Sequence, residues 1–240
     1  MSEKFPALDS AIVETLRGVS TPTITTILLK NGIRNVWVRG ARPMHGGSPR
    51  KVGRAFTLRF IPSREDLATT AAWASPRSTR AAIESMPEGC IAVVAANAHT
   101  DSGIFGDILC QRMALRGVAG LVTDGVVRDV NGVNATGLPV WSQGTAAPAS
   151  ASGMIFVNWQ EPIGCGGVAV YPGDLIVADD DGAVVVPEAL LQEVMTAGPA
   201  QESQEHWIME QVRQGAELPG LYPPNGEAIA RYEAFQRTGR

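Results

Sequence analysis

The sequence predicts an α/β fold with a central sheet or barrel, and three observations support this prediction. Short apolar segments with the pattern of buried strands recur along the 240 residues and alternate with amphipathic helical patterns. Hydrophobic residues make up 45% of the chain and charged residues 18%, a balance typical of a compact globular protein. Neither an internal repeat nor a linker-like stretch divides the sequence, so we expect one domain over residues 1–240.

Helical patterns come first in the chain and strand patterns follow them. An amphipathic helix is expected over residues 7–17. Ser20 precedes a second helix, which Asn31-Gly32 ends. Strands are then predicted at residues 36–39, 42–44 and 53–60.

Residues 64–85 form an insert of mixed character. Ser75-Pro76 separates two helical stretches, and Arg77 and Arg80 lie three positions apart on one helix face. This cationic face could bind a second carboxylate or a polyhydroxylated substrate. A solvated helix face is the simpler interpretation.

A polar loop follows a buried strand in the middle of the chain. Residues 89–96 have the pattern of the strand, and residues 97–102 form the loop, which carries His99 and Asp101. Either side chain could act as a base or orient a metal ligand through a hydrogen bond. The alternative is ordinary loop chemistry, since Asn and Asp are common turn formers.

Residues 103–131 carry the clearest functional signal. Asp107 opens a helical pattern, a buried strand is predicted over 118–123, and Arg128-Asp129 follows that strand. Asp107 is therefore expected at the start of a helix, and the Arg128-Asp129 pair just past the end of a strand. In α/β proteins, ligands bind at both kinds of position.

These side chains have the chemistry that a divalent metal acting on a small carboxylate needs. Asp107 and Asp129 offer hard oxygen ligands for Mg²⁺ or Mn²⁺, with water completing the shell. Arg128 presents a planar fork to a carboxylate or enolate oxygen. The backbone N–H groups of Ile108 and Leu109 could hold the other end of an anion. The alternative is an Asp107 that only caps its helix and a surface ion pair between Arg128 and Asp129.

The C-terminal part combines further strands with a helical extension over residues 188–240. Residues 179–182 (Asp-Asp-Asp-Gly) lack the spaced ligands of a calcium loop and predict a hairpin turn. We expect the extension to pack on a neighbouring subunit. The predicted strands cover residues 138–141, 156–159, 168–171, 175–178 and 183–186. One helix is predicted to begin at Pro187-Glu188, and two more are predicted over residues 200–214 and 227–237.

Charge and cysteine content limit which classes of partner and which cellular compartment are expected. The net charge of −4 argues against nucleic acid, because phosphate binding needs a basic face. The three cysteines are far apart and lack a CxxC pair, so neither a disulfide framework nor zinc is expected. The N-terminus has no signal-peptide pattern and no apolar run reaches the length of a membrane span, so we expect a cytoplasmic protein without a membrane partner.

The spacing of the acidic residues resembles a family signature. Asp107, twenty intervening residues and then Arg128-Asp129 are similar to the D-x20-R-D signature of the RraA-like superfamily. The stretches 137–140 and 172–187 also resemble that family, and the likeness covers about residues 15–215. The family includes the class II pyruvate aldolases known as 4-hydroxy-4-methyl-2-oxoglutarate/4-carboxy-4-hydroxy-2-oxoadipate aldolases. It also includes an inhibitor of ribonuclease E.

The resemblance implies an architecture. It implies a swivelling α/β/α core assembled as homotrimers or as dimers of trimers (homohexamers). In the aldolases a glutamate of an adjacent chain approaches the metal, a role that Glu202 or Glu205 could have here. Many relatives carry an aspartate where Thr26 stands, which puts a role of that helix at the active site in doubt.

The resemblance also implies roles for the residues of the site. Asp129 would ligate Mg²⁺ or Mn²⁺ directly and Asp107 through water. Arg128 would bind substrate together with Gly106 and the backbone of Ile108 and Leu109, three residues that flank Asp107.

These roles predict a metal-dependent lyase. It would cleave a 4-hydroxy-2-oxo acid to pyruvate plus an aldehyde or keto acid, and would decarboxylate oxaloacetate as a side activity. The chain has three lysines, Lys4, Lys30 and Lys51, all outside residues 103–131, which disfavours a Schiff-base aldolase. The alternatives are a non-enzymatic regulator of ribonuclease E and a related lyase or hydratase acting on a sugar-acid-derived 2-oxo acid.

Overall fold

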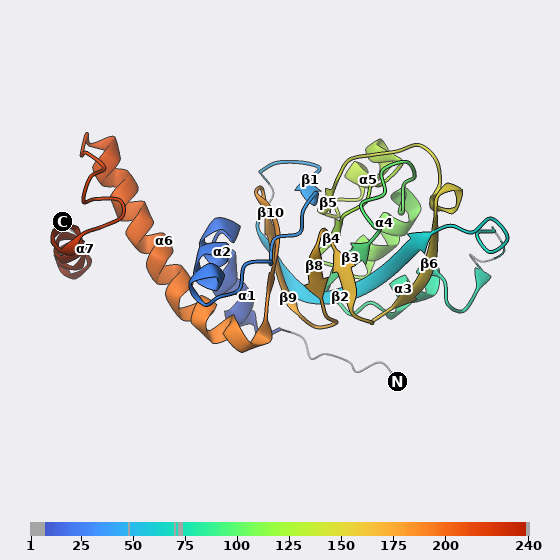
Figure 1. Cartoon of the computed structure of the whole chain (residues 1–240), viewed down its shortest axis with the longest axis horizontal. Coiled ribbons are helices and arrows are strands. Elements are labelled where there is room, and N and C mark those ends of the chain that lie inside the picture. Colours follow the sequence, from blue (N-terminus) through green and yellow to red (C-terminus); the bar gives the residue numbers. More distant parts are fainter. Residues whose placement is uncertain (1–7, 48, 70, 72–73, 239–240) are drawn as a thin grey trace.

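The computed structural model describes residues 8–47, 49–69, 71 and 74–238. It confirms the α/β class: a curved, nearly closed sheet carries helices on its outside, and two C-terminal helices extend away from it (Figure 1). The strands are β1 Arg42–Pro43, β2 Lys51–Pro62, β3 Ile91–Ala95, β4 Gly120–Thr123, β5 Val140–Ser142, β6 Met154–Trp159, β7 Ile163–Cys165, β8 Val168–Val170, β9 Leu175–Asp179 and β10 Gly182–Val186. The helices are α1 Ser10–Arg17, α2 Thr21–Lys30, α3 Thr79–Ser85, α4 Asp107–Leu115, α5 Val130–Ala135, α6 Leu191–Arg213 and α7 Gly226–Thr238, with short 3-10 turns at Ser150–Ser152 and Glu188–Leu190.

The main sheet has the strand order β1-β5-β4-β3-β2-β9-β10. Strands β2, β3, β4 and β5 run parallel to one another. The other pairs are antiparallel: β1 with β5, β6 and β9 with β2, and β10 with β9. The end strands β1 and β10 lie against each other, which brings the sheet close to a barrel. Because β2 to β5 are parallel, their carboxyl ends meet at one edge, where ligand sites of α/β sheets usually form.

The helices that connect the parallel strands cover one face of the sheet. Alternating residues of β2 and β3, such as Phe56, Leu58 and Val94, pack with Met113 of α4 and Val133 of α5 in one buried cluster. The residues between them, such as Ile91 and Val93, face the other way and meet the β7–β8 hairpin in a second cluster. This two-sided burial explains why β3 is apolar throughout.

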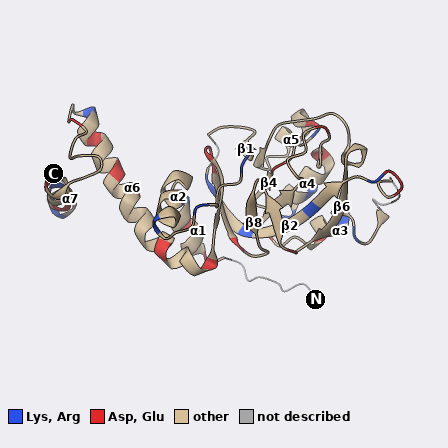
Figure 2. Cartoon of the chain, in the orientation of Figure 1, with Lys and Arg blue, Asp and Glu red and all other residues tan. Residues whose placement is uncertain are grey.

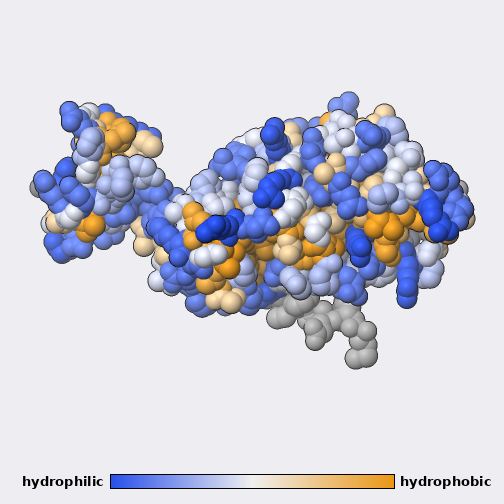
Figure 3. All heavy atoms as spheres, in the orientation of Figure 1, coloured by the Kyte–Doolittle hydropathy of each residue, from blue (hydrophilic) through white to orange (hydrophobic). Residues whose placement is uncertain are grey.

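Helices α1, α2 and the first half of α6 pack on β9 and β10. The second half of α6 leaves the body and forms a small core of its own with α7, in which Trp207 and Tyr232 pack with ring centroids 5.6 Å apart. Figure 2 shows acidic residues along α6, and Figure 3 shows hydrophobic side chains reaching the surface of this arm. Among the described helices, none combines the length and hydropathy that crossing a membrane requires.

The structure corrects several sequence expectations. The strand predicted at residues 36–39 is reduced to an isolated bridge between Trp37 and Val184. The two helices expected from Pro187-Glu188 and over 200–214 are one continuous helix, α6, with Pro199 inside it. Its two halves are buried in different clusters, and this packing outweighs the helix-breaking tendency of proline. In the insert, α3 forms after the Ser75-Pro76 break, whereas the described residues before that break lie in turns, irregular backbone and, at positions 71 and 74, 3-10 conformation rather than in an α-helix. Helix α5 was not expected, because its sequence has low helix propensity.

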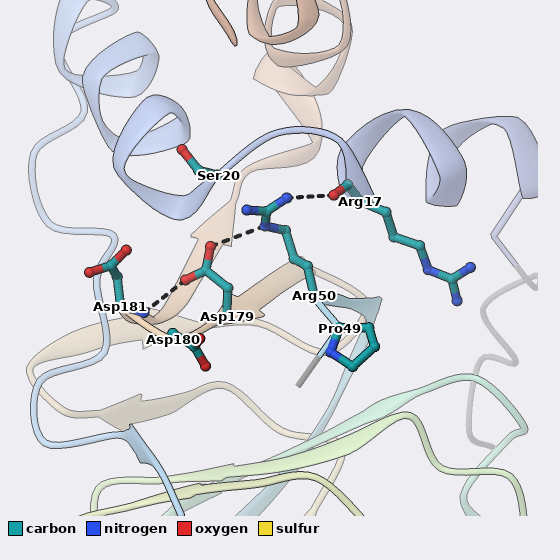
Figure 4. Close-up of a pocket in the computed structure, with 7 residues that line it drawn as sticks. All are labelled: Arg17, Ser20, Pro49, Arg50, Asp179, Asp180 and Asp181. Atoms are coloured by element: carbon teal, nitrogen blue, oxygen red, sulfur yellow. Dashed lines mark hydrogen bonds and ion pairs between the residues drawn. The ribbon is translucent and has the colours of Figure 1, made fainter. Parts of the chain in front are cut away.

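A buried carboxylate joins the start of α2 to the sheet. Asp179, at the end of β9, accepts hydrogen bonds from the N–H and hydroxyl of Thr21 at 2.9 and 2.6 Å. It also accepts a hydrogen bond from Nε of Arg50 at 3.0 Å, which Figure 4 shows. Burial alone would raise the pKa of Asp179, but these hydrogen bonds outweigh it and hold the pKa below its ordinary value. Glu202 of α6 accepts the Ser20 N–H at 2.8 Å, so two carboxylates satisfy the start of α2.

Replacing Asp179 should therefore weaken the fold and change its pH dependence. The Asp179→Asn variant should lose roughly 2 kcal/mol of unfolding free energy, because Arg50 and the Thr21 donors lose a charged acceptor. A carboxylate whose pKa is lowered by folding stabilises the protein fully above the unfolded pKa of about 3.9, and this stability is lost as the pH falls from there through the lower pKa of the folded state. Thermal unfolding between pH 7 and pH 3 should show a flatter acid decline in the variant, and an equally steep decline would contradict this account.

Candidate functional site

The loops that follow β3 and β4 lie side by side at the carboxyl edge of the sheet. The Ile104 N–H donates to the Val126 carbonyl at 2.9 Å, and the Arg128 N–H donates to the Phe105 carbonyl at 2.9 Å. Gly103 forms a parallel bridge with Val126, so the pairing of the strands continues past their ends. These contacts bring residues 103–107 to residues 126–129.

The three side chains predicted from the sequence lie at this edge. Gly106 caps α4, and Asp107 occupies its first turn. Asp129 precedes α5 with φ 56° and ψ 45°, a left-handed backbone that aspartate tolerates better than most residues. Arg128 Nε donates to Asp129 Oδ2 at 3.1 Å, and the two side chains are 36% and 39% exposed, so they remain accessible to a ligand.

Two glycines make room for the two carboxylates. A Cβ on Gly106 would overlap Oδ2 of Asp129, and a Cβ on Gly132 would lie 2.5 Å from Oδ2 of Asp107. The Asp129 carboxylate therefore lies against Gly106, the residue before Asp107. The Asp107 carboxylate lies against Gly132, in the helix that follows Asp129. Because Gly106 is the neighbour of Asp107, with about 3.8 Å between their Cα atoms, the carboxylate of Asp129 lies beside the start of α4.

The buried thiol of Cys110 is close enough to both carboxylates to respond to their charge. Burial, with added repulsion from Asp107 and Asp129, raises the pKa of Cys110 to about 12. The thiol is therefore protonated at neutral pH and packs as an apolar group below the site.

The backbone donors expected to bind an anion are only partly free. The Ile108 N–H donates to Oδ1 of Asp107 at 2.7 Å, and the Ile108 side chain points into solvent, 81% exposed. Leu109 is half-buried against the core below α4. The Asp107 carboxylate thus accepts one N–H of the first turn, but Gly106 and not Asp107 occupies the N-cap position, and Oδ2 of Asp107 faces Gly132.

His99 lies near the same edge and contacts a buried hydroxyl. Its Nε2 lies 2.9 Å from Oγ of Ser102, and Asp101 beside it is exposed. Ser102, which the sequence interpretation did not single out, is fully buried one residue before Gly103. No sequence pattern distinguishes it from an ordinary loop serine.

The predicted glutamates lie on the other side of the molecule from α4 and α5 within one chain (Figure 1). Glu202 binds the Ser20 N–H, and Glu205 accepts a hydrogen bond from Nε2 of Gln201 at 2.9 Å. The Thr26 hydroxyl donates to the carbonyl of Pro22 at 3.0 Å, as a helical threonine commonly does.

Asp124, the residue directly after β4, is a buried structural residue. It is 4% exposed, and its carboxylate accepts the N–H groups of Ala96, Ala98 and Gly166 at 2.6, 3.2 and 3.1 Å. It thus joins the ends of β3 and β4 to the β7–β8 hairpin. The sequence feature that could have singled out Asp124 is its position directly after a predicted buried strand.

The donor set fits a hydrated divalent cation. Within the described part of the chain, no three His, Cys, Asp or Glu side chains converge as a complete metal cage. Asp107 and Asp129 would supply two carboxylates, and water and substrate the remaining positions, which is the coordination that Mg²⁺ favours. Gly106 and Gly132 leave room for the carboxylates of Asp129 and Asp107, each beside the segment that carries the other.

The fold and site define an α/β protein with an acidic and cationic site at the carboxyl edge of its parallel strands. The family model described as RraA-like (Aldolase/RraA) matches residues 21–185, which include the whole site. The chain therefore belongs to the RraA-like family.

Solved structures agree with this assignment. RraAS2 of Streptomyces coelicolor, described as an unusual member of the RNase ES inhibitor RraA protein family, is 36% identical with a TM-score of 0.76, over 85% of this chain and 98% of that one. An uncharacterized protein of Pseudomonas syringae is 26% identical with a TM-score of 0.76, over 91% of this chain and 100% of the other.

Two curated relatives match over shorter spans. A Halalkalibacterium halodurans protein named "Putative 4-hydroxy-4-methyl-2-oxoglutarate aldolase" is 36% identical over 55% of this chain and 64% of its own length. Protein DlpA of Legionella pneumophila is 30% identical over 70% of this chain and 26% of its own length. This chain thus spans less than two thirds of the length of either relative.

A methyl group at Gly106 should disturb the site without unfolding the protein. Gly106 has φ −120° and ψ −173°, a backbone that alanine adopts freely, so the effect of Gly106→Ala falls on the carboxylate of Asp129. We expect Mn²⁺ binding, measured by calorimetry, to weaken about tenfold, as when a group that orients a ligand is displaced.

Gly164→Ala is the matched control, because a Cβ there meets no atom within 4 Å. It should bind Mn²⁺ as the wild type does. If the folded Gly106→Ala protein binds Mn²⁺ with unchanged affinity, the Asp129 carboxylate beside Gly106 is not a ligand of the metal.

Proposed function

We propose that the protein is a Mg²⁺- or Mn²⁺-dependent lyase that cleaves a 4-hydroxy-2-oxo acid to pyruvate and an aldehyde or keto acid. The observation that carries the proposal is the meeting of Asp107, Arg128 and Asp129 at one edge of the sheet, in a family with relatives named as aldolases. Two carboxylates provide ligands for a hard cation, and an adjacent guanidinium provides a site for the substrate carboxylate.

The residues of the chain divide the chemistry between them. When bound, the cation would act as a Lewis acid toward the enolate oxygen that develops at C2. Arg128 would bind and orient the 2-oxo acid and offset the developing negative charge. Asp107 would orient the water that accepts the proton of the 4-hydroxyl, after which the C3–C4 bond breaks and C3 of the pyruvate enolate is protonated.

The lysines support this class over Schiff-base chemistry. Lys51 begins β2, at the end of that strand opposite the carboxyl edge, and Lys30 is exposed at the end of α2. Lys4 lies outside the described residues. A Schiff-base lysine has to be desolvated beside the substrate carbonyl, and neither described lysine belongs to the loops past β3 and β4 that carry the site.

Asp129 is the residue on which activity should depend most. Oxaloacetate decarboxylation forms the same pyruvate enolate, so it is a convenient assay, with pyruvate followed through lactate dehydrogenase. We expect Mg²⁺-dependent turnover that EDTA abolishes, and a loss of about a hundredfold or more in kcat for Asp129→Ala. Glu14→Ala, which removes an exposed carboxylate of α1 outside the site, should retain most of the activity.

Near-normal turnover by Asp129→Ala would refute the assignment of the metal site. The second candidate function, regulation of a ribonuclease, is favoured by the 36% identity to RraAS2 over 98% of that chain. Co-purification of the protein with a ribonuclease of the RNase E type, together with inactivity toward oxaloacetate and 4-hydroxy-2-oxo acids in Mg²⁺ or Mn²⁺, would establish the regulator instead.

The C-terminal arm supports a homo-oligomer as part of this proposal. Met209, Leu218, Tyr222 and Phe235 of α6, α7 and the loop between them are exposed large apolar side chains, which usually mark a contact surface. We propose that residues 188–240 pack on a neighbouring chain in a trimer or a dimer of trimers. Light scattering should give three or six times the chain mass of 25.4 kDa, and a monomeric mass would exclude this role of the arm.

A further inference from the structure

A second pocket opens beside the candidate site, between the insert and β6. Its volume is about 240 Å³, and β6, the turn at Ser150–Ser152 and the described part of the insert surround it. We call four polar residues of its lining, Ser75, Arg77, Ser78 and Ser150, the rim. We call its two aromatic residues, Phe60 and Phe156, the floor. The proposed reaction leaves this pocket without a role.

The floor of the pocket is in direct contact with the segment that carries Asp107. Phe60 packs edge-on against Phe105 with ring centroids 6.0 Å apart and against Phe156 at 5.3 Å. Phe105 is two residues before Asp107, and its carbonyl accepts the N–H of Arg128. One aromatic ring therefore separates the pocket from the backbone of the site.

The rim reaches the site by a second route. A Cβ on Gly153, which follows the turn at Ser150–Ser152, would lie 2.5 Å from Nε2 of His99 and 3.1 Å from Oγ of Ser102. Gly103, which follows Ser102, donates its N–H to the carbonyl of Pro148 at 2.9 Å. A Cβ on Gly103 would lie 2.7 Å from Cβ of Arg128. The loop that forms the rim is thus packed against the loop that positions Arg128.

The layout of the sheet explains why the two places adjoin. Helices α3, α4 and α5 share one layer, and each starts from the edge at which β2, β3 and β4 end. Arg77 lies just before α3 and Asp107 starts α4, so they occupy neighbouring positions along that edge. Packed helices stand about 8–10 Å apart, a distance that the distal part of an elongated substrate could cover.

The chemistry of the rim favours hydroxyl groups as the ligand. Oγ of Ser75 accepts the Arg77 N–H at 3.1 Å and Oγ of Ser78 accepts the Ala81 N–H at 3.4 Å, so each hydroxyl still has its own proton to donate. In the described part of the chain, Arg77 has no carboxylate within ion-pair distance. Donors above a floor of aromatic rings suit a carbon chain that bears several hydroxyl groups.

We propose that this pocket binds the hydroxylated tail of the substrate, and that the protein cleaves 2-oxo-3-deoxy acids derived from sugar acids. This inference rests on the proposed function. In the reaction, the 4-hydroxyl loses its proton and its oxygen becomes the aldehyde carbonyl. The electron pair of the C3–C4 bond passes to the pyruvate enolate, which is protonated at C3, so no oxidant or reductant is needed. The aldehyde released carries the hydroxyl groups that the pocket holds.

Two substrates that differ in their tails test this proposal. 4-Hydroxy-2-oxopentanoate ends in a methyl group, whereas 2-keto-3-deoxygluconate carries two further hydroxyl groups, and both release pyruvate by cleavage of the same bond. We expect kcat/KM of the wild-type protein to be about tenfold higher for the longer substrate. In the Arg77→Ala and Ala68→Leu variants this ratio should fall to about one, because the first loses a hydrogen-bond donor and the second fills the pocket. The change should come mainly from a higher KM for the longer substrate.

Arg34→Ala, which changes an exposed arginine in the segment after α2, is the matched control and should keep the wild-type ratio. If oxaloacetate or the short substrate is turned over but the ratio is near one, or is the same in all variants, the pocket is not a tail site and the proposed lyase stands without it. If none of the three acids is turned over, the proposed function fails and this inference fails with it.

Discussion

The account depends on hydrogen bonds between two loops rather than on any single side chain. Past the ends of β3 and β4, residues 103–105 and 126–128 continue to pair backbone to backbone. Such pairing satisfies groups that a bare sheet edge would leave to water, and it fixes the register of one loop against the other. Asp107 and Asp129, twenty-two positions apart in the sequence, become neighbours because each is placed directly after this pairing. The glycines at 106 and 132 complete the arrangement, since any larger residue would push a carboxylate away from the other.

Much of this edge could be predicted from the sequence because the patterns that form it are local. The apolar run before residue 97, the helical pattern from Asp107 and the strand before Asp124 predict β3, α4 and β4 to within about two residues. Each element is long enough or buried enough for periodicity to dominate its conformation. Once the strands are parallel, their carboxyl ends must share an edge, so the proximity of Asp107, Arg128 and Asp129 follows from topology. The turn at 179–182 was predicted for the same reason, as a short connection between two apolar strands, and β9 and β10 do pair there.

What could not be predicted depends on contacts between distant parts of the chain. Helix α5 follows a left-handed Asp129 and has a sequence of low helix propensity, so tertiary packing of Val133 decides its conformation. The continuity of α6 through Pro199 depends on two separate cores, neither of which is visible in a local window. Asp124 is followed by glycine, as in an ordinary turn, yet three N–H donors from the end of β3 and the β7–β8 hairpin make it a buried junction. The pocket beside Arg77 likewise exists only because residues 150–157 return to the insert. Roles for Glu202 and Glu205 across a subunit contact remain predictions that a single chain does not test.

The most direct test of the central claim is anomalous diffraction from crystals of the protein soaked in Mn²⁺. The account predicts one strong anomalous peak per chain, within ligand distance of Asp129 and within reach, through one water, of Asp107. Adding pyruvate should place its carboxylate beside Arg128 without moving that peak. A fully occupied peak elsewhere, for example at the acidic turn of residues 179–181, with none between Asp107 and Asp129, would contradict the account.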